Sequence, residues 1–226
     1  MPRSSRTPAH RVFVRAIQQE EPNATVTCSL HPPPIQSSSG NGFIGKIGSR
    51  SDHDQYVGEA ESLKAINVAA PGLAPRLIAC GVIDKDSAES DSDIGKPFFL
   101  SEYKDMGPLT DAAAKILGKR LATEMHAYKS TQGFGFHVPT YCGRTRLDNG
   151  WFETWEKCYD ALIAGLLTEL GKSGGYKNLC KQGEEVRKRV IPALLSPLAI
   201  QPLLLHGDLW SGNTGHRPVK WCSRYI

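Results

Sequence analysis

Residues 206–213 read His-Gly-Asp-Leu-Trp-Ser-Gly-Asn and combine side chains suited to phosphoryl transfer. Asp208 stands two positions after His206 and five before Asn213, which is the spacing of loops that direct a hydroxyl onto a phosphate. The Asp208 carboxylate would accept the proton of the attacking hydroxyl. The Asn213 amide oxygen would hold a Mg²⁺ ion that bridges phosphate oxygens. His206 would fix the loop through hydrogen bonds.

The spacing alone leaves five positions free and can arise by chance, so the rest of the octet matters. The complete octet resembles the signature of the fructosamine/ketosamine 3-kinase family, a branch of the protein-kinase-like group. Residues 58–63, Gly-Glu-Ala-Glu-Ser-Leu, resemble that family's helix with its lysine-pairing glutamate. A middle segment agrees as well: Phe134-Gly135-Phe136-His137, then Cys142-Gly143, Trp151 and Trp155. The resemblance covers roughly residues 43–215.

This resemblance implies an α+β, protein-kinase-like two-lobed fold, with an antiparallel-sheet small lobe, a helical large lobe and ATP in the cleft between them. It also implies transfer of the γ-phosphoryl group of ATP, with Mg²⁺, to the 3-hydroxyl of a ketosamine. The expected acceptors are ribulosamine or fructosamine adducts on glycated protein lysines, or small ketosamines. Phosphorylation there destabilises the adduct and frees the amine, so the implied role is deglycation.

Further site residues follow from the resemblance by position. Lys46 would pair with the α- and β-phosphates, although on its own it could equally be a solvated strand lysine. Glu59 would be its ion-pair partner. The backbone of Glu102 and Tyr103 would meet the adenine. Trp210 is either a core aromatic or a ring that borders the sugar site.

Patterning predicts the elements that must position these residues. Strands near 43–48, 76–83 and 97–103 should pair in one antiparallel sheet, with a helix near 53–68 packed beside it. Beyond a hinge near Met106–Leu109 the apolar spacing turns helical. The expected helices cover Ala113–Tyr128, Trp155–Leu170 and Lys181–Leu195, the last with Val186, Val190 and Leu194 facing inward.

The expected organisation has three parts. Residues 1–42 would be a poorly defined arm with a remnant of the phosphate-loop region, 43–107 a small ATP-binding lobe and 108–226 a partial large, catalytic lobe. Prolines interrupt the stretch His31–Gly42, and proline cannot donate to a sheet ladder. Within it, Gly40 and Gly42 could cover the phosphates, but no clear strands flank them.

The sequence departs from the family pattern after Asn213. The family has an Asp-Pro on the next strand as a second metal ligand, whereas residues 214–226 contain no Asp or Glu. We therefore expect a chain cut short at its C-terminus, with an incomplete large lobe and a rate lower by orders of magnitude. A gene-model error or truncation would explain this, and a real nucleotide-binding pseudokinase is the alternative. An aminoglycoside- or choline-type kinase shares the H-G-D…N frame but usually lacks the Trp-Ser-Gly filling.

Composition suits a globular protein and excludes some functions. Hydrophobic residues make up 40% of the 226, and the net charge of +4 comes without a long Lys/Arg block, so no nucleic-acid partner is expected. No apolar run approaches the ~20 residues of a membrane span. Six cysteines without a C-x-x-C pair indicate free thiols in a reducing compartment. We expect a cytoplasmic monomer; an arginine-rich start leaves mitochondrial targeting open, although Pro2 and Pro8 disfavour the required helix.

Overall fold

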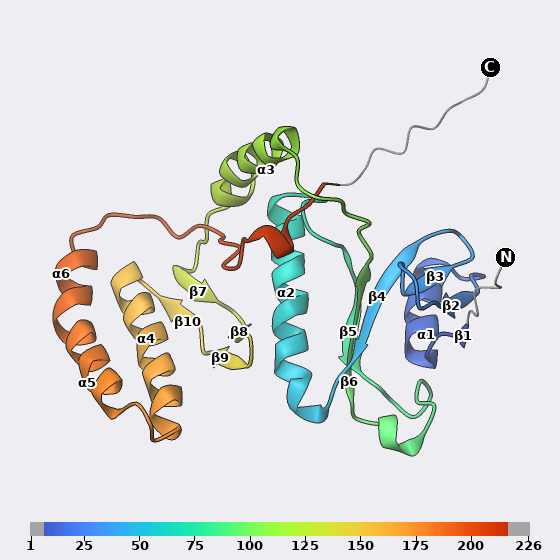
Figure 1. The fold of residues 1–226 in the computed structure, drawn as a ribbon, viewed down its shortest axis with the longest axis horizontal. Helices are drawn as coiled ribbons and strands as arrows, with labels where there is room; N and C mark the ends of the chain where they lie inside the picture. The colour runs from blue at the N-terminus through green and yellow to red at the C-terminus, as the bar shows by residue number, and fades with distance from the viewer. Residues whose placement is uncertain (1–6, 217–226) are drawn as a thin grey trace.

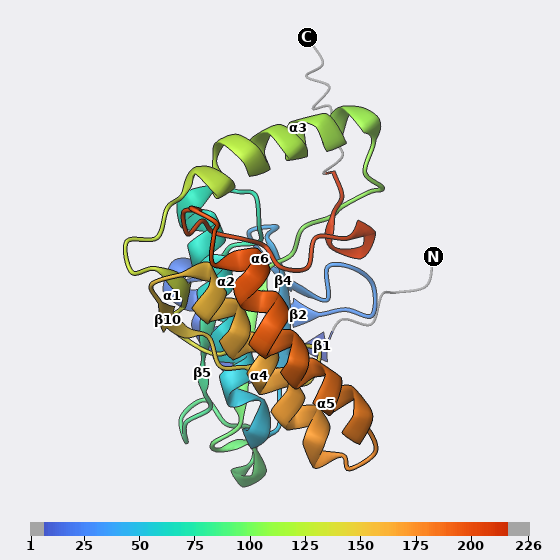
Figure 2. The ribbon, with the colours of Figure 1, turned by 90° about the vertical axis from the view of Figure 1, so that its left-hand side faces the viewer.

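The computed structural model describes residues 7–216, which form a mixed α+β structure around a six-stranded antiparallel sheet (Figures 1 and 2). The strand order is β1-β2-β3-β4-β6-β5, and every neighbouring pair is antiparallel. The strands are β1 Thr7–Pro8, β2 Val26–Cys28, β3 Ile35–Ser37, β4 Gly42–Ile47, β5 Leu77–Val82 and β6 Pro97–Glu102.

The predicted pairing of the three longer strands is confirmed. Phe99 of β6 lies opposite Lys46 of β4 on one side and Cys80 of β5 on the other. Phe99 and the neighbouring Leu100 are fully buried, because β6 is central and both of its faces are covered. The sequence pattern was sufficient here because each of these strands has six residues.

The prediction of a poorly defined arm is wrong for residues 7–42; residues 1–6 lie outside the described part. Helix α1 (Arg11–Glu20) covers one face of the sheet, with Val12, Phe13, Ala16 and Ile17 buried at helical spacing. A Cβ on Gly45 of β4 would lie 2.7 Å from Phe13 Cζ, so glycine allows α1 to approach this closely. The sequence pattern did not predict strands β1–β3, because each has only two or three residues and prolines lie in β1 and between β2 and β3.

Helix α2 (His53–Ala69) covers the opposite face of the sheet, as Figure 1 shows, and confirms the helix predicted near 53–68. The rings of Tyr56 and Phe99 lie 6.3 Å apart across this interface. Farther along the helix, Ile66 and Ala70 pack against Met125 in a second small core. The sheet therefore lies between α1 and α2, and its α2 side carries the side chains that matter for function.

The remaining described chain contains helices, two small two-stranded sheets and a long irregular segment after α6. Helix α3 (Asp111–Thr123) ends earlier than predicted, α4 (Trp155–Lys172) is close to its prediction, and α5 (Lys177–Glu185) continues through a π-helical turn into α6 (Ile191–Leu195). Figure 2 shows α5 and α6 end to end, with α4 beside them. The sheets pair β7 (Phe134–Phe136) with β10 (Gly150–Phe152) and β8 (Thr140–Cys142) with β9 (Thr145–Leu147), none of which patterning predicted.

The inward face predicted for the last helix is wrong. Val186, Val190 and Leu194 are 41%, 43% and 64% exposed. The helices turn a different side toward α4, where a Cβ on Gly183 would lie 2.5 Å from Leu167.

Two expectations from composition, on membrane spans and on free thiols, concern features of residues 7–216. None of the helices described there is long and apolar enough to cross a bilayer. Within the same range Cys28, Cys80, Cys142, Cys158 and Cys180 carry free thiols. The sixth cysteine, at position 222, lies outside the described residues.

Candidate active site

The predicted Lys46–Glu59 ion pair is present. Lys46 projects from β4 toward α2, and its Nζ donates to both carboxylate oxygens of Glu59, at 2.8 and 2.9 Å. Nζ also lies 5.2 Å from the centre of the Phe99 ring. The two side chains are 43% and 40% exposed, and a pair this open contributes only about 0–1 kcal/mol to stability. The main effect of this pair is therefore to orient the charged Lys46 side chain at an open surface.

The local sequence places these two residues together. A short 3₁₀ turn, Arg50–Asp52, connects β4 directly to α2. Asp52 accepts hydrogen bonds from the backbone N–H and hydroxyl of Ser49, both at 2.7 Å, which lower the pKa of its carboxyl. Burial raises the pKa of Tyr56, whose ring fixes the first turns of α2 on the sheet. A strand, a tight turn and a helix thus bring Lys46 opposite Glu59.

Glu102 and Tyr103 lie at the end of β6, where the chain leaves the sheet. Their backbone N–H groups are already used: Glu102 donates to the carbonyl of Arg76 at 2.8 Å, and Tyr103 donates to Gly42 at 2.9 Å. The Glu102 carboxylate accepts from Lys104 Nζ at 2.8 Å. A base bound here would therefore meet other backbone groups, and the next N–H along the chain is that of Lys104.

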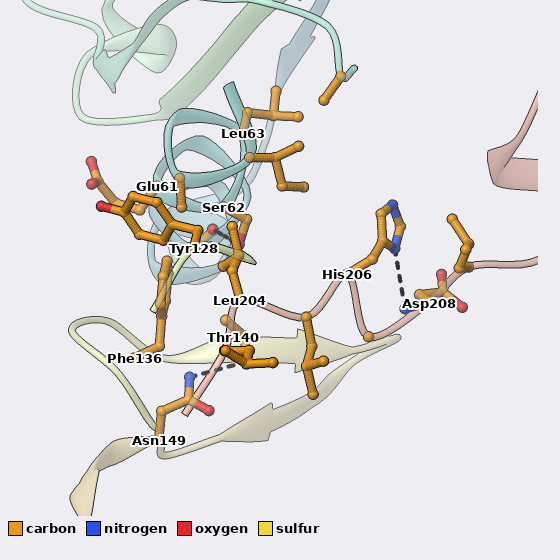
Figure 3. Close-up of a pocket in the computed structure, with 18 of the residues that line it drawn as sticks. Glu61, Ser62, Leu63, Tyr128, Phe136, Thr140, Asn149, Leu204, His206 and Asp208 are labelled. Atoms are coloured by element: carbon orange, nitrogen blue, oxygen red, sulfur yellow. Dashed lines mark hydrogen bonds between the residues drawn. The ribbon is translucent and has the colours of Figure 1, made fainter. Parts of the chain in front are cut away.

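The loop with Asp208 is held by its own side chains (Figure 3 shows the first of these contacts). His206 Nδ1 accepts from the Asp208 backbone N–H at 3.2 Å, which is the structural contact predicted for this histidine. Asn213 Nδ2 donates to the Asp208 carbonyl oxygen at 2.9 Å and to its carboxylate at 2.8 Å. A 3₁₀ turn over Ser211–Asn213 sets this geometry. Asp208 and Asn213 are both exposed, so their polar groups can reach a ligand.

Trp210 is not a core residue, because 58% of it is exposed. Its ring lies over the backbone of Gly212, where a Cβ would come within 2.3 Å of the indole. The core-aromatic alternative is therefore wrong. The ring is available to a substrate beside the loop.

One cavity joins the two sets of residues. An open space of about 1930 Å³ is lined by Glu59 of α2 on one side and by His206, Asp208 and Asn213 on the other. The segment after the loop returns to the hinge, where Gly107 and His216 exchange backbone hydrogen bonds of 2.9 and 3.2 Å. The fold thus brings Glu59, the partner of Lys46, and the Asp208 loop to a shared opening.

The donor groups suit a nucleotide better than a complete metal site. Lys46, oriented by Glu59, fits phosphate oxygens, and Asn213 offers one amide oxygen to a cation. Mg²⁺ is usually held by carboxylates and waters in octahedral geometry. Within residues 7–216 no group of three His, Cys, Asp or Glu side chains comes together to hold a metal.

The stretch His31–Gly42, in which the phosphate-covering loop is expected, contributes to two turns at opposite ends of the β2–β3–β4 meander. Gly40 lies in the turn between β3 and β4, and Gly42 begins β4. Since Lys46 lies toward the other end of β4, the loop at its end of the sheet is the one between β2 and β3, residues 29–34. Pro33 of this loop packs on Gly42, where a Cβ would lie 2.7 Å from Pro33 Cβ.

Comparisons with known proteins agree with this architecture. A family model described as Fructosamine kinase matches residues 7–220. A chloroplastic protein-ribulosamine 3-kinase of Oryza sativa subsp. indica is 30% identical over 180 residues, covering 79% of this chain and 49% of that protein. The Arabidopsis thaliana protein of the same name is 35% identical over 124 residues, 54% of this chain and 37% of that one. A probable ketoamine kinase of Escherichia coli (strain K12) is 27% identical over 182 residues, 80% and 58%.

Solved structures show the same fold. Crystal structures assigned as fructosamine-3-kinases from Haemophilus somnus 129PT and Thermobifida fusca match with TM-scores of 0.62 and 0.63 at 19% and 20% identity. The matches cover 86% and 93% of this chain and 59% and 62% of those chains. This chain likewise spans about half the length of the curated relatives it matches. Because the family model extends over nearly all of it, the chain belongs to the fructosamine kinase family.

Proposed function

We propose that this chain contributes the ATP site and the catalytic base of a kinase that phosphorylates the 3-hydroxyl of ketosamines. The observation that carries the proposal is the shared cavity between Glu59, the partner of Lys46, and the Asp208 loop. The family match and the names of the relatives, protein-ribulosamine 3-kinase and ketoamine kinase, support the substrate class. The acceptors would be ribulosamine or fructosamine adducts on protein lysines, or small ketosamines.

The nucleotide would lie between two lobes of a protein-kinase-like fold. Residues up to 107 would form the small lobe, including residues 7–42, which join its sheet, and residues from 108 would belong to the large lobe. Lys46, held by Glu59, would bind the α- and β-phosphates, as the corresponding pair does in protein kinases. The hinge backbone around Glu102 and Tyr103, with the Lys104 N–H as donor, would meet the adenine. We place this protein in the cytoplasm as a monomer.

The chemical step needs a base beside the acceptor. ATP supplies the γ-phosphoryl group when it is bound. Asp208 would accept the proton of the 3-hydroxyl as that oxygen forms its bond to the γ-phosphorus, and ADP leaves with the electron pair of the broken P–O bond. Asn213 would keep the Asp208 carboxylate aimed through its 2.8 Å contact. The exposed Trp210 ring would border the sugar.

A second function has one specific observation in its favour. Residues 214–226 contain no Asp or Glu, so the polypeptide of residues 1–226 could bind a nucleotide without efficient transfer. Such a protein would be a non-catalytic nucleotide-binding pseudokinase.

The test uses an extended chain, in which residues 1–215 are followed by the segment of the Escherichia coli relative that comes after its counterpart of Gly215. We expect this extended chain to convert ATP and ribulosyl- or fructosyl-lysine into ADP and a 3-phosphate, located by ³¹P–¹H correlation NMR. Choline and an aminoglycoside serve as competing acceptors. Phosphorylation of either of those in preference to the ketosamines would contradict the proposal. Saturable ATP binding by the 226-residue polypeptide without any transfer, beside an active extended chain, would favour the second function.

A further inference from the structure

Two sides of helix α2 make contacts with other parts of the chain. Glu59 and Tyr56 face the sheet, where they contact Lys46 and Phe99. Asp54, Gln55, Gly58 and Glu61 form a second stripe at spacings of three to four residues, the spacing of one side of a helix. This stripe contacts residues 134–152, the segment that contains β7–β10 and is called here the brace.

Polar contacts connect the stripe to the brace at both ends. Near the start of α2, the Arg146 guanidinium pairs with the Asp54 carboxylate, and Gln55 Nε2 donates to the Gly143 carbonyl at 3.3 Å. One turn beyond Gly58, the carboxylate of Glu61 lies 3.0 Å from His137 Nε2. Lys64 and then His137 lower the pKa of Glu61, which keeps that carboxylate charged.

Between these contacts the backbones of helix and brace touch. A Cβ on Gly58 would lie 2.5 Å from the carbonyl oxygen of Pro139, closer than real Cβ atoms approach. Any other residue at position 58 would force α2 and the brace apart. By contrast, helical Gly118 and Gly165 have nothing within 4 Å of an added Cβ. Gly58 is therefore matched to this interface and is not simply a tolerated helical glycine.

The brace is itself well supported. Asn149 Nδ2 donates to the Val138 carbonyl at 2.9 Å and to Thr140 Oγ1 at 3.1 Å, which joins its two hairpin-like sheets. On the far side, the Phe134 ring lies 5.9 Å from that of Trp155 at the start of α4. The brace thus contacts both α4 and the side of α2 that faces away from the sheet.

We infer that the brace sets the position of α2 and thereby the Lys46–Glu59 pair, which makes Gly58, Arg146 and His137 positioning residues of the nucleotide site. An outward shift of α2 would separate Lys46 Nζ from Glu59, now 2.8 Å apart. In protein kinases the placement of the corresponding helix decides whether this pair forms. The nucleotide part of the inference rests on the proposed function, whereas the mechanical part does not.

The experiment compares Gly58→Ala and Arg146→Gln with Gly118→Ala and Gly165→Ala, all in the 226-residue chain. Hydrogen exchange of the α2 backbone over residues 56–66 reports the mechanical part. ATP affinity, followed by competition with a fluorescent trinitrophenyl-ATP, reports the site. We expect exchange in α2 to rise about tenfold or more in Gly58→Ala, to rise by up to about fivefold in Arg146→Gln, whose ion pair with Asp54 is about half exposed, and to stay unchanged in the two controls. ATP affinity should fall by about fivefold or more in Gly58→Ala and by about two- to fivefold in Arg146→Gln.

A double-mutant cycle separates positioning from general damage. In a Glu59→Gln background, Arg146→Gln should weaken ATP binding further by less than about twofold, because its effect passes through Glu59. Full additivity of the two losses would overturn the inference, as would unchanged exchange in both Gly58→Ala and Arg146→Gln. If Gly58→Ala fails to fold, Arg146→Gln decides. If the parent chain does not bind ATP, the proposed function fails while the exchange measurement still decides whether the brace holds α2.

Discussion

Asp208→Asn is expected to lower the rate of ketosamine phosphorylation by the extended chain about 10²–10⁴-fold, the usual loss when a positioned base is removed. Asparagine keeps the shape of the side chain, and its oxygen can still accept from Asn213 Nδ2, which also binds the main-chain carbonyl of residue 208. The loop should therefore keep its conformation while losing the proton acceptor. Initial rates of ADP release with saturating fructosyl-lysine measure the effect.

ATP affinity provides the internal control for this variant. It should stay within about twofold of the parent, because the lost group acts on the acceptor hydroxyl and not on the nucleotide. A variant that retains more than about a tenth of the parent rate would show that Asp208 is not the base. A variant that loses ATP binding as well would place Asp208 in nucleotide binding instead.

The polypeptide of residues 1–226 is expected to transfer phosphate at least about 100-fold more slowly than the extended chain, on the scale of losing one major electrostatic contributor. Residues 214–226 supply no Asp or Glu, and the described residues bring no three metal-binding side chains together. Exposed Leu194 and Leu205 should also make this polypeptide prone to association, since bare apolar surface favours aggregation.

Both proteins should be compared as monodisperse samples at equal active concentration. Titration with Mg²⁺ should also require a higher concentration for half-maximal rate in the 226-residue polypeptide, because fewer protein oxygens hold the ion. Turnover within tenfold of the extended chain, abolished by Asp208→Asn, would contradict this prediction. It would mean that a carboxylate elsewhere in residues 1–226 completes the metal site.

The parts of the fold that the sequence predicted are those with long, regular elements. Strands β4, β5 and β6 have six residues each, and α2 has seventeen, so alternation and helical spacing were visible. Strands β1–β3 and β7–β10 have two or three residues each, which is too short for a period to show. Their pairing depends on tertiary contacts, such as that of Ile35 in β3 with Gly45 in β4, that no local pattern contains.

The site followed the same rule. The Lys46–Glu59 pair was predictable because a strand, one tight turn and a helix separate the two residues, so their distance is set locally. The structural role of His206 in the Asp208 loop was predictable because the hydrogen bonds that hold this loop lie within residues 206–213. Three features were not predictable from sequence alone, because they depend on distant parts of the chain. They are the exposure of Trp210, the packing of the 29–34 loop on Gly42 and the contacts of the brace with α2.

The central claim, that Lys46 and Glu59 form the phosphate-binding pair of a nucleotide site, is tested most directly by an equilibrium titration of the 226-residue chain with ATP. We predict saturable binding with one site per chain. Lys46→Met should weaken it by about tenfold or more, the value of one charge-assisted hydrogen bond to phosphate, while the surface variant Lys157→Met should not change it. Absence of saturable ATP binding by a folded chain, or equal affinity in Lys46→Met, would contradict the account.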